Sequence, residues 1–342
     1  MRGIETRAWS PDGAGPWRAP GAFPMAAQAE VGTWPDLVAT LVRRCDRHPA
    51  PRAGVVFPVD ASALAGALQA HRAGVVRARL IGPRDRIHEV AAGARLSLYD
   101  LEVTDVPDEP SALAAAADAV RAGRVDLLVK GSGHSRSLLH AVLECATEPR
   151  PLRRASHVFV VAVPRWPRLL LVTDAVVNTF PDLCDKADIV RNAVDLARLL
   201  GVERPKVAVL GAVEDVESSM PSTIHAATLA QMGRRGQLGS ATVDGPLALD
   251  DALDARALVA KGIDSPLGGQ ADVLVVPDVE AGNILYKGLV VLGGAVAAGV
   301  VVQTPVPVVL ASRSDSVETR VASAALGSIW VGRAAAPLRA AG

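Results

Sequence analysis

The sequence predicts an α/β fold with two domains, in which parallel-rich sheets carry helices on both faces. Short runs of β-branched residues alternate with helical segments of about ten to fifteen residues, a pattern typical of parallel strands joined by crossover helices. Half of the 342 residues are apolar, enough for a sizeable core without disulfides or metal ions. Several apolar runs end in short polar turns, and open α/β sheets bind ligands at such strand ends.

The N-terminal half alternates strands with helices once the pattern becomes regular near Trp34. Residues 1–30 are rich in Pro, Gly, Ala and Arg without periodicity, so we expect a disordered N-terminal extension there. Apolar spacing after Pro35 predicts a first helix, and alternating patterns then predict strands at 54–57, 78–82 and 125–129 and helices at 62–71, 83–92 and 111–122. The last of these strands stops at Lys130-Gly131, where a further helix opens.

The C-terminal half continues the alternation. An amphipathic helix at 185–200 ends at Gly201, a residue suited to a helix C-cap. Asp244-Gly245-Pro246 is a turn signal after a short strand. The remaining runs predict strands at 158–163, 169–172, 206–210, 241–243, 273–276, 300–302 and 306–310, and helices at 222–234 and 284–298.

One charge-free stretch, residues 288–312, is long enough to resemble a membrane span. We reject this interpretation because Gly293-Gly294, Gly299 and two prolines divide the stretch into a helix, a strand, a turn and a second strand.

An Arg/Pro-rich connection near 152–156 predicts the domain boundary. Residues 31–152 and 299–342 would form domain I, and residues 153–298 would form domain II. The cleft between two such halves is the natural place for an active site.

Composition excludes several classes of protein. The formal net charge is zero and no basic stripe is interleaved with aromatic residues, so a nucleic-acid partner is not expected. The three cysteines are widely spaced with no CxxC pair, which argues against a disulfide framework or structural zinc and for a reducing compartment. The N-terminus lacks an apolar signal-peptide core. We therefore expect a cytoplasmic protein without a membrane partner.

The first candidate binding segment is KGSGHSR at 130–136, which follows a strand and opens a helix. Backbone N–H groups at a helix start favour an anion, and glycine permits close approach. The pattern is neither a complete dinucleotide fingerprint nor a Walker A loop, so an ordinary strand-to-helix turn remains an equal alternative. The candidates here are Lys130, Gly131, His134, Ser135, Arg136 and His140, of which the last two share a helix face.

The second candidate region follows two apolar strands. The strand at 273–276 leads into a helix that carries Asn283 and Lys287, and the strand at 306–310 ends in Ser312-Arg313-Ser314-Asp315-Ser316. An amide, an ammonium and a guanidinium in one cleft would suit a phosphorylated substrate, because a guanidinium binds phosphoryl oxygens bidentately. The alternative is a helix N-cap at Ser314 or Ser316, followed by Glu318 or Thr319.

Other chemistry-bearing residues are weaker candidates. Cys145 lies on an apolar helix face, where a buried structural cysteine is the commoner outcome. The seven histidines have no HxH or HExxH spacing, so no metal site is expected. Asp244, Asp174 and Asn178 follow strands and are possible cleft residues.

In combination these segments resemble the phosphate acetyl/butyryl transferases, and more closely their butyryl-type branch. The matching blocks run from Ser156 to Leu326 and include TDAVVN, MPSTIHAATLAQM, GNILYKG and SRSDSVE, with KGSGHSRSLLHAVL before them. The resemblance implies a fold akin to the isocitrate/isopropylmalate dehydrogenases, usually as a homodimer. It implies the reaction acyl-CoA + phosphate ⇌ acyl phosphate + CoA, with coenzyme A as substrate and no bound cofactor or metal.

The resemblance also implies a mechanism and residue roles. The CoA thiolate would attack the acyl phosphate directly in a ternary complex. Arg313 would neutralise the phosphate and stabilise the developing oxyanion, while Ser312 would hydrogen-bond the thiol or the tetrahedral centre. Lys130, Asn283 and Lys287 match the family's substrate-binding segments.

Two positions depart from the family pattern. Acetyl-type members place an aspartate seven residues after the serine as the base for the thiol, and here Thr319 stands there, so Asp315 or Glu318 must be considered instead. The family often has an arginine where this chain has His140, and Arg136 could substitute. A non-catalytic CoA or acyl-phosphate binding homologue and an NAD-dependent decarboxylating dehydrogenase are the alternatives. The latter would need a metal-binding aspartate cluster, which Asp244 and Asp278 do not make.

Overall fold

The structure is a computed structural model that describes residues 35–45, 49–99, 101–146, 153–312 and 315–333. The predicted disordered extension at 1–30 and Arg313 lie outside the described residues.

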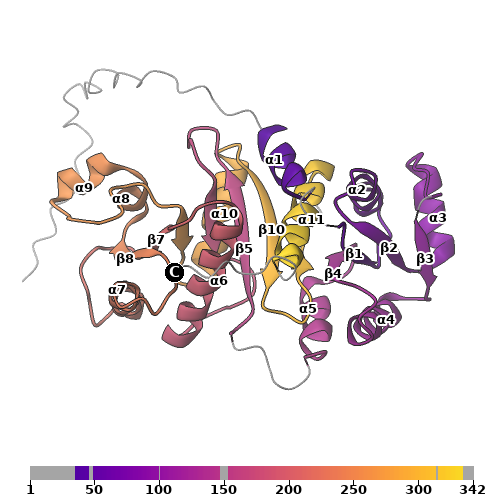
Figure 1. The fold of residues 1–342 in the computed structure, drawn as a ribbon, viewed down its shortest axis with the longest axis horizontal. Coiled ribbons are helices and arrows are strands. Elements are labelled where there is room, and N and C mark those ends of the chain that lie inside the picture. The colour runs from indigo at the N-terminus through magenta and orange to yellow at the C-terminus, as the bar shows by residue number, and fades with distance from the viewer. Residues whose placement is uncertain (1–34, 46–48, 100, 147–152, 313–314, 334–342) are drawn as a thin grey trace, which may run out of the picture. The chain divides into compact units, whose positions relative to one another are not determined.

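A single mixed sheet organises the described part of the chain. Its eleven strands lie in the order β3-β2-β1-β4-β11-β10-β5-β6-β9-β7-β8 (Figure 1). They are β1 Arg52–Val56, β2 Arg77–Gly82, β3 Glu102–Asp105, β4 Leu127–Lys130, β5 Ser156–Ala162, β6 Leu170–Thr173, β7 Lys206–Leu210, β8 Thr242–Leu247, β9 Val273–Val275, β10 Val296–Val302 and β11 Val308–Val309. The predicted α/β class with a large, mostly parallel sheet is confirmed.

Strand direction reverses in the middle of the sheet. Strands β3, β2, β1, β4 and β11 are mutually parallel, and β6, β9, β7 and β8 form a second parallel group. Between them, β10 is antiparallel to both β11 and β5, and β5 is antiparallel to β6. Three successive antiparallel pairs place the carboxyl ends of the two groups at opposite edges of the sheet.

Helices cover both faces, as the sequence predicts. They are α1 Pro35–Cys45, α2 Ala61–Arg72, α3 Arg84–Gly93, α4 Glu109–Arg121, α5 Ser135–Leu143, α6 Leu183–Leu199, α7 Pro221–Arg234, α8 Leu249–Leu253, α9 Ala255–Lys261, α10 Val279–Val291 and α11 Val317–Gly332. Helices α1, α2, α6, α7 and α11 share one apolar core with one face of the sheet. On the other face, α8, α9 and α10 pack around a second core and α4 and α5 around a third.

Two local predictions are wrong. The helix expected at 284–298 ends earlier, and residues 296–302 form β10, which pairs along its whole length with β5. Central strand pairing there overrides the helix propensity of its alanines. Asp244-Gly245-Pro246 lies inside β8 rather than in a turn, next to an irregularity in the β7–β8 register.

Strand β3 and the short helices α8 and α9 were not predicted, because each is too short to show a clear period. Within the described ranges, no helix has the length and apolar character required to cross a bilayer. The predicted division at 152–156 separates strands of one continuous sheet, and the assignment of two domains stays a prediction.

Candidate functional site

Three neighbouring strands bring three loops to one edge of the sheet. Strand β4 pairs in parallel with β1 on one side and with β11 on the other. Each strand is followed by a loop and a helix, namely β1 by α2, β4 by α5 and β11 by α11. The N-termini of three helices therefore lie at this edge, and their partial positive charges favour an anion.

The loop after β4 lies unusually close to the loop after β1. Gly131 N–H donates to Val56 O at 2.9 Å, and Ser132 N–H donates to Phe57 O at 2.8 Å. A Cβ on Gly131 would lie 2.6 Å from both carbonyl oxygens. Phe57 itself has a φ of 54°, a left-handed conformation that is uncommon for a bulky residue. Glycine at 131 is thus required by the close approach of two main chains.

Lys130 lies beneath this loop. Its side chain is buried, and its Nζ donates to Gly131 O at 3.2 Å and to Gly133 O at 3.3 Å. The ammonium therefore fixes two carbonyl groups of the glycine loop by hydrogen bonds and adds a full positive charge next to the α5 N-terminus.

Asp60 and Ser132 join the first two loops. Ser132 Oγ donates to Asp60 Oδ2 at 2.5 Å and accepts Val59 N–H at 2.9 Å, while Asp60 Oδ1 caps α2 by accepting Ala63 N–H at 2.8 Å. Burial raises the pKa of Asp60, but the hydrogen bonds from Ser132 and Ala63 and the charge of Arg320 outweigh it and leave that pKa below its usual value.

The loop after β11 is shaped by Ser312 and Asp315. Ser312 N–H donates to Asp315 Oδ2 at 2.6 Å, and Asp315 N–H donates back to Ser312 O at 3.2 Å. The N-cap of α11 is Ser316, whose Oγ accepts Thr319 N–H at 3.2 Å. One of the two predicted capping residues is thus confirmed.

The candidate bases differ in their surroundings. Asp315 is half-buried, and its carboxylate lies beside Ser312. Glu318 is exposed in the first turn of α11, where hydrogen bonds from its own backbone N–H and from Ser316 lower its pKa. The Thr319 hydroxyl lies 3.4 Å from Ser316 Oγ and belongs to the helix cap.

Two of the predicted residues after the glycine loop, His134 and His140, lie beside carboxylates of the chain. His134 N–H donates to Glu109 Oε1 at 2.8 Å, and His134 Nδ1 lies 3.2 Å from the same oxygen. His140 Nδ1 lies 3.4 Å from Glu144 Oε1. Arg136 is exposed and makes no hydrogen bond or ion pair with the part of the chain that the structure describes. Ser135 is the first residue of α5, a helix whose N-terminus has no capping side chain from His134.

Asn283 and Lys287 lie on α10, one turn apart and both exposed. Because β9 and β11 run in opposite directions, the strand ends that precede α10 and Ser312 lie at opposite edges. Helix α10 then runs back along the sheet. Tyr286 on this helix has a pKa raised to about 12, mainly by burial and to a smaller extent by the negative charge of Asp315. The strands that precede Lys130-Gly131 and Ser312 are parallel neighbours, whereas one cleft shared by these residues, Asn283 and Lys287 stays a prediction.

Sequence reasoning missed Asp60, Ser132 and Arg320, which tie the loops together. Asp60 carried a usable signal, because it follows a predicted strand and precedes a helix as an N-cap residue does. Arg320 had none, since a charged residue in the second turn of a helix usually faces solvent.

The weaker candidates have structural roles. Cys145 Sγ donates to Ala141 O at 3.1 Å, and burial raises the pKa of its thiol. Asp174 is buried, and its oxygens accept the N–H groups of Val176 and Val177, both at 2.9 Å, and the Asn178 amide at 2.7 Å. Asp244 Oδ2 accepts Ser265 Oγ at 2.7 Å.

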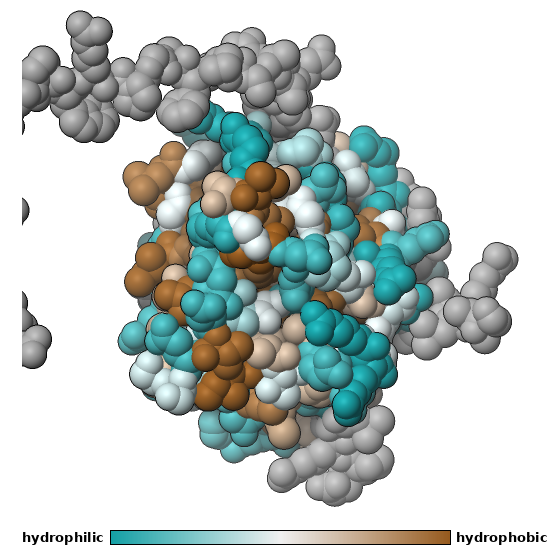
Figure 2. All heavy atoms as spheres, turned by 90° about the vertical axis from the view of Figure 1, so that its left-hand side faces the viewer, coloured by the Kyte–Doolittle hydropathy of each residue, from teal (hydrophilic) through white to brown (hydrophobic). Residues whose placement is uncertain are grey.

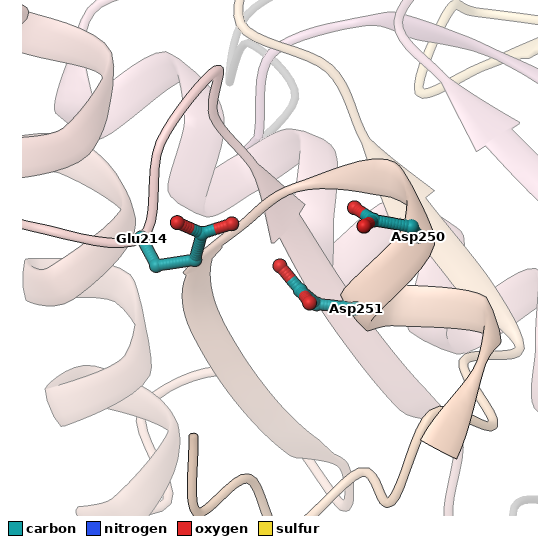
Figure 3. A group of neighbouring side chains, drawn as sticks. All are labelled: Glu214, Asp250 and Asp251. Atoms are coloured by element: carbon teal, nitrogen blue, oxygen red, sulfur yellow. The ribbon is translucent and has the colours of Figure 1, made fainter. Parts of the chain in front are cut away.

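A cluster of three carboxylates lies apart from this edge. Glu214, Asp250 and the fully buried Asp251 each place one oxygen within 4.8 Å of the others (Figure 3). Lys261 Nζ lies 2.7 Å from Glu214 Oε1 and 3.0 Å from an oxygen of each aspartate. The ammonium therefore already occupies the place that a metal ion would take.

We expect Lys261→Met to destabilise this part of the fold, because it leaves a buried carboxylate without its cation. Thermal unfolding of the variant should have a lower midpoint than the wild type. Added Ca²⁺ should raise that midpoint in the variant and leave the wild type unchanged, since the metal can enter only when the ammonium is gone. A calcium-dependent midpoint in the wild type would contradict the assignment.

Comparisons with known proteins agree on one family. The family model described as "Phosphate acetyl/butaryl transferase" matches residues 109–328. A phosphate acetyltransferase of Rhizobium meliloti is 47% identical over 288 residues, covering 84% of this chain and 91% of the relative. A phosphate butyryltransferase of Clostridium beijerinckii is 38% identical over 293 residues, covering 86% and 97%.

Solved structures show the same similarity. A branched-chain phosphotransacylase from Enterococcus faecalis V583 superposes with a TM-score of 0.70 at 30% identity, over 82% of this chain and 99% of the other. A phosphotransacetylase from Streptococcus pyogenes, at 20% identity and a TM-score of 0.72, shares the fold over 88% of this chain and 99% of the other.

Proposed function

Because the chain belongs to the phosphate acetyl/butyryl transferase family, we propose that it catalyses the reversible transfer of a short acyl group between CoA and inorganic phosphate. The observation that carries the proposal is the edge where β1, β4 and β11 end, with three helix N-termini and the buried Lys130. Such an edge suits a phosphoryl group, which both the acyl phosphate and free phosphate present.

The proposed chemistry needs no acyl-enzyme. The thiolate of CoA attacks the carbonyl carbon of the acyl phosphate, a C–S bond forms, and the C–O bond to phosphate breaks with departure of phosphate. In reverse, a phosphate oxygen attacks the thioester and the thiolate leaves. Both directions pass through a tetrahedral centre with a negative oxygen, which fixed positive charge stabilises.

We assign the roles as follows. Arg313 neutralises the phosphate and the developing oxyanion, and Ser312 hydrogen-bonds the thiol or the tetrahedral centre. Asp315 is the preferred base for the thiol, since its carboxylate lies next to Ser312, and Glu318 is the second choice. A thiol with a pKa of about 8.5 needs only modest help near neutral pH.

The proposed substrate contacts divide into two groups. Lys130, Gly131, Ser135 and the α5 N-terminus would bind phosphate, with Arg136, His134 and His140 at the outer rim. Asn283 and Lys287 would contact CoA from the other side of an interdomain cleft, as in the predicted dehydrogenase-like arrangement. CoA enters as a substrate, no further cofactor is required by this chemistry, and we propose a cytoplasmic location.

The test is phosphate-dependent release of CoA, followed with a thiol reagent, from acetyl-, butyryl- and isobutyryl-CoA. Relatives named acetyltransferase and butyryltransferase both match, so the relative rates with the three acyl-CoAs will show which acyl chain the enzyme prefers. Omitting phosphate is the control, and turnover should stop. CoA binding without exchange of labelled phosphate would instead indicate a non-catalytic homologue, which the threonine at 319 makes worth testing. Nicotinamide reduction with magnesium would indicate a dehydrogenase.

We further propose that a second copy of the chain covers α10. Apart from Glu280, Asn283 and Lys287 this helix has no charged or amide side chain, yet only Gly282 is buried in it. Ile284, Gly288, Val291 and Leu292 form one stripe, in which Ile284 is 73% and Leu292 89% exposed. An exposed apolar stripe next to polar residues is typical of a protein–protein contact, and the family resemblance implies a homodimer.

The combined variant Ile284→Asp with Leu292→Glu should convert a particle of twice the chain mass into one of single mass, measured by light scattering. The matched control is Val259→Glu on α9, where Val259 is 81% exposed. The end of the molecule that carries α9 shows apolar patches separated by polar surface (Figure 2). The control should therefore leave the mass of the particle unchanged. A dimer that survives the α10 variant would exclude this surface.

A further inference from the structure

Arg320 lies buried directly under the candidate site. It is in the second turn of α11 and only 5% exposed. Its side chain runs across α2 at Gly66, where a Cβ would lie 2.8 Å from Arg320 Cβ and 2.9 Å from Cδ. The alkyl part of the Arg320 side chain therefore occupies a space that exists only because α2 has a glycine at its point of contact with α11.

The guanidinium fixes the peptide of Ser312. Its Nη2 donates to Ser312 O at 2.8 Å, while Ser312 N–H is held by Asp315 Oδ2 at 2.6 Å. Both polar groups of the Ser312 backbone are thus hydrogen-bonded, the carbonyl to Arg320 and the N–H to Asp315.

The same charge acts on the neighbouring loop. Arg320 contributes to lowering the pKa of Asp60, whose carboxylate holds Ser132 Oγ at 2.5 Å. Arg320 and Lys130 also line one cavity of about 10 Å³, which is room for about one water molecule. Both cationic side chains thus border one small cavity, although their charged ends hydrogen-bond different loops.

This arrangement is costly for stability alone. A guanidinium has five N–H donors, and Arg320 Nε has no hydrogen-bond partner among the described residues. Burying a guanidinium also carries a large desolvation cost, which its hydrogen bonds and the charge of Asp60 offset only in part. The carboxylate of Asp60 offsets one of the two buried cations, and a phosphoryl group bound above the loops would offset the second.

We propose that Arg320 is a positioning residue for the phosphate side of the reaction. It orients the Ser312 peptide and supplies fixed positive charge beneath the phosphoryl group, without touching substrate itself. The inference rests on the proposed phosphate acyltransferase function. It adds a residue that no sequence motif indicated and that acts through Ser312, Asp60 and Lys130.

The test compares Arg320→Met, Arg320→Lys and Arg320→Ala in the full chain. Phosphate-dependent CoA release gives KM for phosphate, KM for acyl-CoA and kcat, and thermal unfolding gives stability. We expect Arg320→Met to lower the midpoint of unfolding and, at a temperature where the variant is folded, to raise KM for phosphate by about tenfold or more, since a buried charge acts through a low dielectric. The KM for acyl-CoA should change by less than about threefold, because the thioester lacks the charge that Arg320 favours.

Two further variants keep the test decisive. Arg320→Lys retains the charge without the planar fork, so its KM for phosphate should lie between those of the wild type and Arg320→Met. Free guanidinium ion added to Arg320→Ala should partly lower its raised KM for phosphate. Arg333→Met is the matched control, since Arg333 lies at the other end of α11, half-buried, with its guanidinium 3.7 Å from the Trp330 ring centroid. It should leave both KM values unchanged.

The inference is overturned if folded Arg320→Met keeps its phosphate KM within about twofold of the wild type, or if both KM values rise equally. Should Arg320→Met fail to fold, an unchanged phosphate KM in Arg320→Lys would overturn it as well. A wild-type chain without phosphate-dependent turnover would defeat the proposed function instead, so the two failures are distinguishable.

Discussion

Arg313→Ala is expected to lower kcat for phosphate-dependent CoA release by about two to four orders of magnitude, the range for a lost group that stabilises transition-state charge. The three helix N-termini at the edge of β1, β4 and β11 supply only partial charges, and Lys130 already spends two donors on Gly131 and Gly133. A guanidinium at 313 would add a planar fork that binds two phosphoryl oxygens at once.

The measurement needs two controls. Arg313→Lys keeps charge without the fork and should lie between wild type and alanine. Cys145→Ala should leave kcat largely intact, since its thiol is buried and donates to Ala141 O. A large loss in Cys145→Ala together with a small loss in Arg313→Ala would point to a thiol nucleophile and would contradict the direct-transfer mechanism.

The class of fold could be predicted from the sequence because strand and helix periods are local. The β-branched runs at 206–210 and 273–276 each became a buried parallel strand, β7 and β9. The helix expected at 185–200 became α6 with a capping box at Asp182 and Asp185. Such features depend on neighbours in the chain, which is why one sequence suffices to find them.

The direction of the strands could not be predicted in the same way. Whether β9 and β11 end at one edge depends on β5 and β10 between them, and these two strands pair antiparallel over a long separation in sequence. The sequence argument placed Asn283 beside Arg313 because each follows a strand. In the structure these strands run in opposite directions, so the contact would have to come from α10 rather than from strand ends.

The supporting residues of the site escaped prediction for a related reason. Asp60 and Ser132 are 72 positions apart and meet only because β1 and β4 are neighbours. Arg320 is buried only because Gly66 on another helix leaves room for it. Pairwise contacts of this kind carry no periodic signal, whereas Lys130-Gly131 was found because a glycine after a strand is a local signal.

Gly131→Ala is the second substitution with a large expected effect. The new Cβ would lie 2.6 Å from Val56 O and from Phe57 O. Both are main-chain atoms that already accept Gly131 N–H and Ser132 N–H, at 2.9 and 2.8 Å. Neither can move without breaking the junction of β1 and β4. We expect the free energy of unfolding to fall by about 2–4 kcal/mol, at the upper end for overpacking.

Activity should fall further than stability explains, because Lys130 and Ser132 flank the displaced glycine and hold the Gly133 carbonyl and the Asp60 carboxylate. Urea unfolding and phosphate KM, measured at a temperature where the variant is folded, separate the two effects. Gly93→Ala in α3 is the control, since a Cβ there meets no atom within 4 Å and alanine favours a helix. Wild-type stability and phosphate KM in Gly131→Ala would mean that the loops after β1 and β4 do not touch in solution, and the phosphate site would have to lie elsewhere.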